Sequence, residues 1–116
     1  MSKHMKKTLS LFIGLCLSLS IMAQKSTDNF TGKWKTEEGV IVEIKKSTTS
    51  FYGKPSGKNV YVLKDLTFSD GKWTGILSNP KKNVTANCEA YLYGNKIKFV
   101  AKRGMMSKEI YWTKVN

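Results

Sequence analysis

The stretch Phe30-Thr31-Gly32-Lys33-Trp34-Lys35-Thr36 is the part of the sequence that decides the fold. Side chains alternate along a β-strand, so Phe30, Gly32 and Trp34 are expected on one face. Glycine lets another backbone approach closely, and the neighbouring indole is large enough to plug one end of a barrel. We expect the C-terminal stretch Ile110-Tyr111-Trp112-Thr113-Lys114-Val115 to be the strand that closes against it.

The sequence between these two stretches also has the residue pattern of strands. The clearest alternation is in 84–93, where one side is Val84, Ala86, Cys88, Ala90 and Leu92. Further strands are predicted at 40–46, 50–54, 60–68 with a bend at Lys64-Asp65, 72–77, 96–102 and 108–115. Asp70-Gly71 is a strong hairpin signal, and turn signals recur about every 8–12 residues. The sequence therefore predicts an all-β fold, a small antiparallel up-and-down barrel of about eight strands.

The first 23 residues differ sharply in composition from the rest. Lys6 and Lys7 precede an apolar run from Leu9 to Ile21, and the small residue Ala23 follows. This order is typical of a secretory signal peptide, and the run is shorter than the roughly 20 apolar residues of a membrane span. We therefore expect a signal peptide helix at 1–23, a disordered lead at 24–29 and the barrel domain at 30–116. The mature protein would be exported to the periplasm or the extracellular space, with no transmembrane span.

The exported part of the chain is strongly basic. The whole sequence has 20 Lys and Arg against 8 Asp and Glu, and removing Lys3, Lys6 and Lys7 with the signal leaves a net charge of +9. Such a charge favours anionic surfaces, such as lipid headgroups, phosphorylated glycans or acidic polymers, although a merely solvated surface has the same composition. Nucleic acid is disfavoured as a partner because we expect export. The sequence leaves the oligomeric state open.

A series of short motifs resembles a known family. The motifs are Gly-Lys-Trp-Lys-Thr-Glu-Glu-Gly at 32–39, Val-Glu-Ile at 42–44, Tyr-Gly-Lys at 52–54, Leu-Lys-Asp-Leu at 63–66, Gly-Lys-Trp-Thr-Gly at 71–75, Asn79-Pro80, Cys88 and Trp112-Thr113. In this order and spacing they resemble the bacterial family known as domain of unknown function 2147. The resemblance covers nearly all of 30–115 and implies a β-rich exported envelope domain, with no activity or site residues. The chain departs from the family at 55–59, where the family loop is longer, and at 81–84, where the family has a glycine-rich turn.

The beginning and end of the domain are also similar to calycin barrels, which include lipocalins, fatty-acid-binding proteins and avidins. The similarity lies in the Gly32-x-Trp34 start and the basic Lys114 near the end. In calycins a first-strand tryptophan packs against a late basic side chain. This similarity implies a lipocalin-like barrel with Trp34 against Lys114.

The exported part lacks the residue sets of common active sites. The one histidine, His4, precedes the apolar run, which leaves no Ser-His pair, Cys-His pair or histidine metal site in the domain. Cys88 is on an apolar strand face and is expected to pack as a small hydrophobe. Glu43 and Glu89 are single acids on outward faces. We predict that the protein is not an enzyme and has no catalytic residues, metal or cofactor.

Two groups of side chains are candidate binding sites. The aromatic group is Trp34, Trp73, Phe99 and Trp112, which would either fill the barrel or line a small apolar pocket. Room for such a pocket would come from the small inward residues Gly75, Ala86, Ala90 and Ala101. The second group is a patch of Tyr91, Tyr93, Lys96, Lys98 and Lys102, which would either bind anions or be an ordinary outward face.

We predict an exported, non-catalytic binding module for a small apolar ligand or an anionic envelope component. The alternative is a structural or interaction protein whose barrel is filled by side chains and holds no ligand.

Overall fold

Strand alternation and short turns produce eight antiparallel strands in the computed structural model, which describes residues 24–115. In chain order the strands are β1 (Gly32–Lys35), β2 (Ile41–Ser47), β3 (Ser50–Pro55), β4 (Leu63–Ser69), β5 (Lys72–Asn79), β6 (Val84–Tyr93), β7 (Lys96–Arg103) and β8 (Met106–Val115). Each strand pairs with the next along the chain, and β8 pairs with β1 to close the barrel. The predicted all-β, antiparallel up-and-down barrel is confirmed. The predicted signal peptide at 1–23 lies outside the described residues.

The first and last strands meet as the sequence predicts. Trp34 on β1 lies opposite Lys114 on β8, and Lys114 Nζ is 4.9 Å from the centroid of the Trp34 ring. The same ammonium group donates a hydrogen bond of 3.0 Å to the carbonyl oxygen of Thr31. Gly32 has a φ of 129°, and a Cβ at this position would lie 2.8 Å from Lys114 Nζ. Glycine therefore both adopts the local backbone conformation and leaves room for the lysine over the indole.

Consecutive hairpins lie at alternate ends of the barrel, because each strand runs antiparallel to the one before it. The β2–β3, β4–β5 and β6–β7 turns lie at one end, which we call the closed end. The β1–β2, β3–β4, β5–β6 and β7–β8 connections lie at the other, which we call the mouth. At the closed end Asp70 and Gly71 have φ angles of 54° and 78°, as the predicted two-residue hairpin requires.

Strand β4 is irregular at the predicted bend. Its register with β5 shifts between Lys64 and Thr67, and Asp65 has a φ of 53°. The bulge brings the β4 backbone against Gly75, where a Cβ would lie 2.9 Å from the carbonyl oxygen of Lys64. The prediction of strand before the bend is wrong for residues 60–62, which lie in the β3–β4 loop.

Aromatic rings fill the closed end. Phe30, Phe51 and Phe68 each meet Trp73 edge to face, at centroid distances of 5.2, 5.4 and 5.4 Å. The sequence predicts Phe30 within the first strand, whereas β1 begins at Gly32 and the fully buried Phe30 ring packs in the core. The carbonyl oxygen of Phe30 accepts a hydrogen bond of 2.9 Å from Trp34 Nε1. This contact satisfies the buried indole N–H of Trp34.

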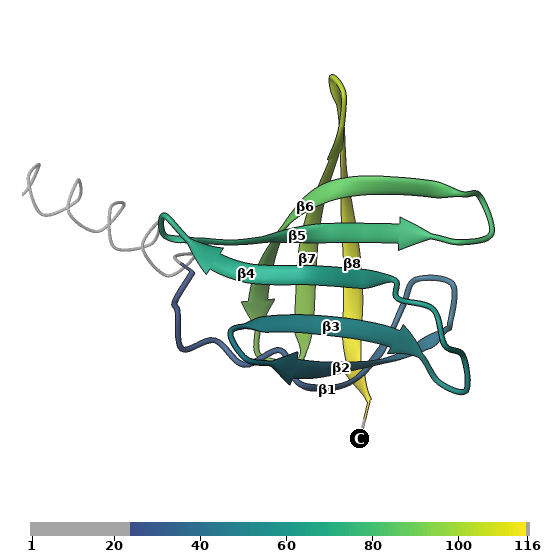
Figure 1. Cartoon of the computed structure of the whole chain (residues 1–116), viewed down its shortest axis with the longest axis horizontal. Helices are drawn as coiled ribbons and strands as arrows, with labels where there is room; N and C mark the ends of the chain where they lie inside the picture. The colour runs from purple at the N-terminus through teal and green to yellow at the C-terminus, as the bar shows by residue number, and fades with distance from the viewer. Residues whose placement is uncertain (1–23, 116) are drawn as a thin grey trace, which may run out of the picture.

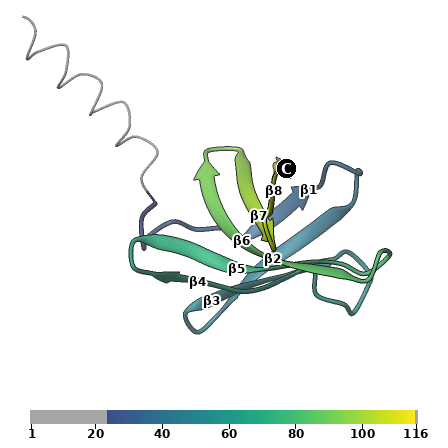
Figure 2. The same cartoon turned by 90° about the horizontal axis from the view of Figure 1, so that it is seen from above.

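The strands form two walls that cross each other. Figure 1 shows β3, β4 and β5 side by side in one wall, with β7 and β8 running across them behind. Figure 2, seen from above, shows β6 curving from one wall into the other. The lead at 24–29 contacts the closed end, where Trp73 Nε1 donates to the carbonyl oxygen of Lys25 at 2.7 Å and Trp73 N–H donates to Gln24 Oε1. Because these contacts hold the lead at the closed end, the lead does not cover the mouth.

Candidate functional site

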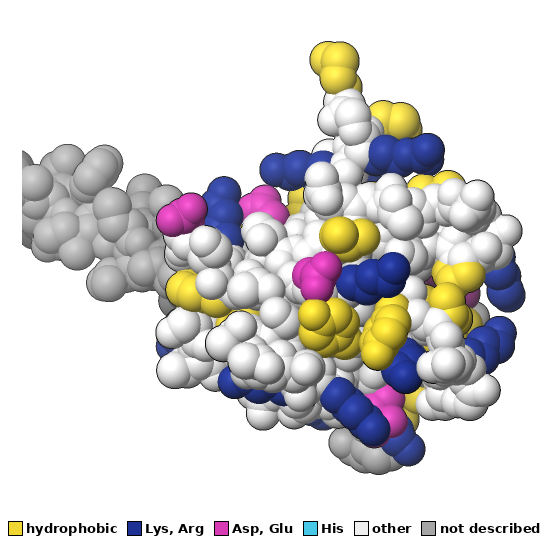
Figure 3. Space-filling model, in the orientation of Figure 1, with side chains coloured by type: hydrophobic (Ala, Val, Ile, Leu, Met, Phe, Trp, Pro, Cys, Tyr) yellow, Lys and Arg dark blue, Asp and Glu magenta, His cyan; other side chains and the backbone are white. Residues whose placement is uncertain are grey.

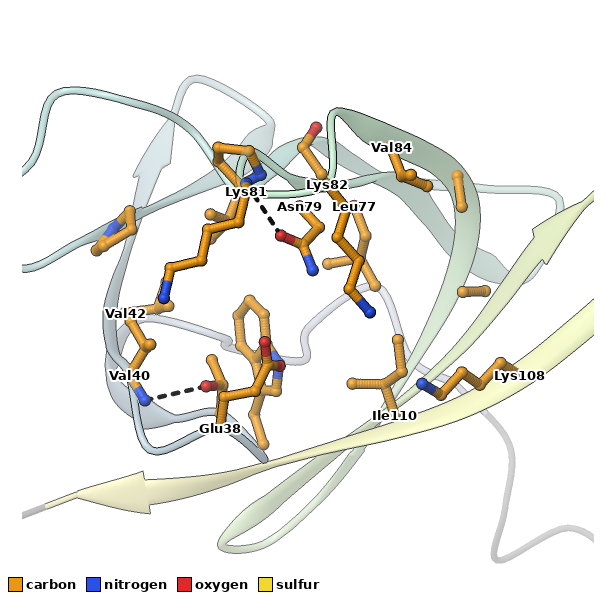
Figure 4. Close-up of a pocket in the computed structure, with 18 of the residues that line it drawn as sticks. Glu38, Val40, Val42, Leu77, Asn79, Lys81, Lys82, Val84, Lys108 and Ile110 are labelled. Carbon is orange, nitrogen blue, oxygen red and sulfur yellow. Dashed lines mark hydrogen bonds between the residues drawn. The ribbon is translucent and has the colours of Figure 1, made fainter.

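A cavity of about 470 Å³ opens at the mouth of the barrel. Its volume is within the range of about 300–1,000 Å³ that is typical of small-molecule sites. The apolar residues of its walls are Val40, Val42, Pro55, Val60, Val62, Leu77, Pro80, Val84, Ala86, Ala101, Met106, Ile110 and Trp112. Figure 4 shows Val42, Leu77, Val84 and Ile110 around the opening.

Small inward side chains explain why the barrel is hollow here. Leu77 on β5 lies opposite Ala86 on β6, and Cys88 on β6 lies opposite Ala101 on β7. An eight-stranded barrel is just wide enough to be filled by large side chains, so two neighbouring alanines leave space that aromatic rings occupy at the closed end. Of the four small residues predicted to make room, Ala86 and Ala101 line the cavity. Gly75 instead accommodates the β4 backbone, and Ala90 is fully buried in the core.

Trp112 forms the boundary between the hollow and the filled half of the barrel. Trp112 lines the cavity, and its ring meets Phe99 edge to face at a centroid distance of 4.6 Å. Trp34, Trp73 and Phe99 are buried in the core and are not among the residues that line this cavity. The structure therefore places one of the four predicted aromatic site residues at the cavity.

Cationic side chains surround the opening. We call Lys58, Lys81, Lys82, Arg103 and Lys108 the rim cations; they come from the β3–β4 loop, the β5–β6 turn and the β7–β8 hairpin. Figure 4 shows the ends of Lys81, Lys82 and Lys108 extending over the opening, across from Glu38. Glu38 is the one acid among the lining residues, and no rim cation lies in an ion pair within residues 24–115. The site is therefore apolar inside and net cationic at its rim.

The side chain of Asn79 also borders the opening. Its Oδ1 accepts a hydrogen bond of 3.2 Å from the backbone N–H of Lys81, which fixes the start of the β5–β6 turn. Figure 4 shows the Asn79 amide between the side chains of Lys81 and Lys82. This arrangement leaves an amide donor beside two ammonium groups, a combination that suits an anionic oxygen.

The predicted basic and aromatic patch lies together on the outer face of β6 and β7. Tyr91 lies opposite Lys98 and Tyr93 opposite Lys96, and Lys98 Nζ is 5.7 Å from the centroid of the Tyr91 ring. Two of its three lysines are paired with acids, since Lys98 Nζ lies 3.4 Å from Glu109 Oε2 and Lys102 Nζ lies 3.4 Å from Glu89 Oε2.

These ion pairs change the titration of the outer face. Burial alone would raise the pKa of Glu89, but the hydrogen bond and charge of Lys102 and the charge of Lys72 lower the pKa below its ordinary value. Partial burial opposes the charge of Lys98, yet Glu109 raises the pKa of this lysine. Partial burial and the hydrogen bond to Glu109 raise the pKa of Tyr111. The patch is thus a network of compensated charges, unlike the rim of the cavity.

Cys88 is buried on the inward face of β6. Burial raises the pKa of its thiol to about 12, so the thiolate that nucleophilic chemistry needs is disfavoured. The described residues contain no group of three or more His, Cys, Asp or Glu side chains that could hold a metal ion. In the same part of the chain, no helix has the length and apolar character needed to cross a membrane.

The rim cations are the site residues that the sequence reasoning did not identify. The signal that could have found them is the alternation of hairpins in an up-and-down barrel. Lys58 and the Lys81-Lys82 pair lie in alternate connections, and Arg103 ends the strand before the next of them; alternate connections lie at the same end. Cations that are distant in sequence, from Lys58 to Lys108, therefore gather around one opening because of the up-and-down strand order.

Comparison with protein-family models, with curated proteins and with solved structures finds no match for this chain. At the level of the fold, the eight-stranded antiparallel barrel with Trp34 packed against Lys114 is consistent with a calycin-like barrel.

Proposed function

We propose that this protein binds a small amphiphile without transforming it, with the apolar part of the ligand in the mouth cavity and an anionic group at the rim cations. The observation that carries the proposal is the cavity of about 470 Å³, whose walls are apolar and whose rim holds five cations against one acid. This arrangement joins at one site the two ligand classes that the sequence predicts.

The walls and the rim would make different contributions. Apolar ligand surface removed from water contributes roughly 25 cal/mol per Å², so the walls would supply most of the affinity. The rim cations are exposed, and salt screens their attraction for an anion over distances of about 10 Å. They would therefore mainly select the sign of the headgroup and speed the approach of the ligand.

The outer patch is the weaker candidate for anion binding. Lys98 and Lys102 already contact acids, whereas the rim cations have no such partners within residues 24–115. An anion at the outer face would compete with Glu109 and Glu89. We therefore place the anionic group of the ligand at the mouth.

The non-catalytic role, export to the cell envelope and membership of the family of domain of unknown function 2147 are parts of the same proposal. The first is supported by the buried, protonated Cys88 and the absence of a histidine after His4. The second and third rest on the sequence features of 1–23 and on the order of the motifs from Gly32 to Trp112.

Calorimetric titration with three ligands of equal chain length tests the proposal. All strand pairs and the described core lie within 24–115, so a chain that begins at Gln24 contains the whole barrel. Its cooperative unfolding is checked first. Decanoate, decanol and decyltrimethylammonium are then titrated below their micelle concentrations. We expect saturable binding in the order decanoate, decanol, decyltrimethylammonium, with the advantage of decanoate reduced at high salt.

A matched pair of variants locates the binding. Ala101→Leu puts a larger side chain into the cavity and should lower decanoate affinity at least about tenfold, because the added atoms occupy the ligand's space. Val100→Leu adds volume on the opposite face of the same strand and should leave affinity unchanged. Absence of saturable binding, or equal binding by both variants, would contradict the proposal and favour the side-chain-filled structural protein.

A further inference from the structure

The β7–β8 hairpin carries two exposed methionines at the mouth of the barrel. Gly104 and Met105 form its two-residue turn between the paired residues Arg103 and Met106. Met105 is fully exposed and Met106 is 79% exposed, and they are by far the most exposed of the large hydrophobic residues in 24–115. Figure 1 shows the hairpin extending well beyond the rest of the barrel, and Figure 3 shows hydrophobic side chains at its tip. Methionines this exposed at a projecting tip bury little surface in the barrel and are suited to an external contact.

Positive charge surrounds the base of this tip. Arg103 and Lys108 flank the methionines in sequence, and both belong to the rim cations. Lys58 and the Lys81-Lys82 pair extend the same charge across the mouth, with Glu38 as the one acid among the cavity's lining residues. Apolar side chains that project ahead of a ring of cations match the layers of an anionic membrane surface, where charged headgroups lie outside an apolar interior.

We infer that the mouth end of the barrel docks on an anionic lipid surface, with Met105 and Met106 entering the headgroup layer and the rim cations contacting lipid phosphates. A protein partner would need an apolar groove to receive the tip, and it would leave the lysines on the far side of the mouth uncovered. A membrane surface, into which the projecting tip can sink, can contact the flanking cations Arg103 and Lys108 as well as the tip. The inference goes beyond ligand binding, since docking does not require an occupied cavity.

Docking in this orientation would place the open cavity against the membrane. Met106 and Lys108 line the cavity and belong to the hairpin, so the hairpin is both the anchor and part of the rim. An amphiphile could then pass between the bilayer and the cavity with little exposure of its apolar chain to water. The closed end and the lead at 24–29 would point away from the surface.

Vesicle co-sedimentation tests the docking with the chain that begins at Gln24, which excludes the apolar segment at 1–23. Vesicles of phosphatidylglycerol with phosphatidylcholine are compared with vesicles of phosphatidylcholine alone. We expect binding to the anionic vesicles that weakens with salt, and little binding to the neutral ones. The double variant Met105→Ser/Met106→Ser should lower the partition coefficient about tenfold, since it removes the inserted apolar surface.

Two charge variants separate the mouth from the outer patch. Lys81→Gln/Lys82→Gln should lower partitioning about tenfold, whereas Lys96→Gln/Lys98→Gln removes the same number of lysines and should lower it less than about threefold. The reverse order would overturn the inference and place the contact at the outer face. Equal binding to soluble polyglutamate and to vesicles, unaffected by the methionine substitutions, would instead assign the mouth to an acidic protein partner.

Two further measurements keep docking distinct from ligand binding. Ala101→Leu should lower decanoate affinity at least about tenfold and leave vesicle binding unchanged, so the two proposals can fail separately. A Met105→Cys variant, labelled with an environment-sensitive dye while Cys88 stays buried, should show a blue-shifted emission on anionic vesicles. An unshifted emission with full co-sedimentation would show that the tip does not enter the headgroup layer.

Discussion

The two ends of this barrel are built from the same alternating strands and differ in packing and charge. At the closed end, rings from Phe30, Phe51 and Phe68 pack on Trp73, and the lead at 24–29 contacts them. At the mouth, the inward residues are aliphatic and small, the cavity is open and the charges are cationic. The difference teaches that aromatic packing fills one end of the barrel, whereas small and aliphatic inward residues leave the other end hollow.

Truncating the central ring of the closed end should give the largest effect. Trp73→Ala removes three edge-to-face contacts and the hydrogen bond to Lys25, so we expect a loss of roughly 3–5 kcal/mol in the free energy of unfolding. Val40→Ala at the mouth, where the side chain is 38% exposed, should cost less than about 1 kcal/mol. Urea denaturation measures both. Similar losses of unfolding free energy for the two variants would contradict the claim that the closed end is packed more tightly than the mouth.

Two alanines on the same face of β6 offer a sharper contrast. Ala90 is fully buried at a position opposite Trp73 on β5 and Phe99 on β7, whereas Ala86 lines the cavity. Ala90→Leu should therefore overpack the core and cost about 1–3 kcal/mol. Ala86→Leu enlarges a side chain that faces open space and should change stability by less than about 0.5 kcal/mol while reducing decanoate binding. An equal cost for the two substitutions would mean that the mouth is as tightly packed as the closed end.

Cys88 lies between these alanines on β6, and the pKa of its thiol depends on whether water reaches the middle of the barrel. Its pKa is raised to about 12 by burial, against about 8.5 for a thiol in an unfolded chain. As pH rises, the Cys88 thiol therefore loses its proton in the unfolded chain before it does so in the folded chain. The free energy of unfolding declines as pH rises above about 8.5. At pH 10 the linkage corresponds to about 1–2 kcal/mol.

The check on this pH dependence is a comparison of the unmodified chain with Cys88→Ala in urea denaturation at pH 7 and pH 10. Lysines and tyrosines titrate in the same range, and the difference between the two chains isolates the thiol. We expect the unmodified chain to lose about 1–2 kcal/mol more than the variant. Equal losses in both chains would indicate that water reaches Cys88 and that the cavity extends deeper than Trp112.

The sequence predicts the fold well because the fold depends on local patterns. The alternation from Val84 to Leu92 specifies which side chains face inward, and Asp70-Gly71 specifies a hairpin, so strand order follows from simple succession. The bend at Lys64-Asp65 is also local, because Asp65 adopts a positive φ. The position of Phe30 is less local, since its ring packs against Phe51 and Trp73, which are distant in sequence.

The candidate site is harder to predict because it depends on how far along the barrel axis each inward side chain lies. Alternation shows that Trp73 and Trp112 face inward, but only the register of each strand with its neighbours shows which of them reaches the mouth. The rim cations are distant in sequence, and the rule that alternate hairpins share an end is needed to bring them together. The partners that neutralise Lys98 and Lys102 likewise come from register, which places Glu109 and Glu89 on adjacent strands.

The central claim is that ligand binding belongs to the mouth alone, and backbone amide chemical shifts during a decanoate titration test it most directly. We predict saturable shifts at cavity residues such as Val42, Ala101 and Ile110, with Phe51 and Trp73 at the closed end unchanged. Saturable shifts centred on the outer face of Tyr91 and Lys98, or no shifts at any accessible concentration, would contradict the account.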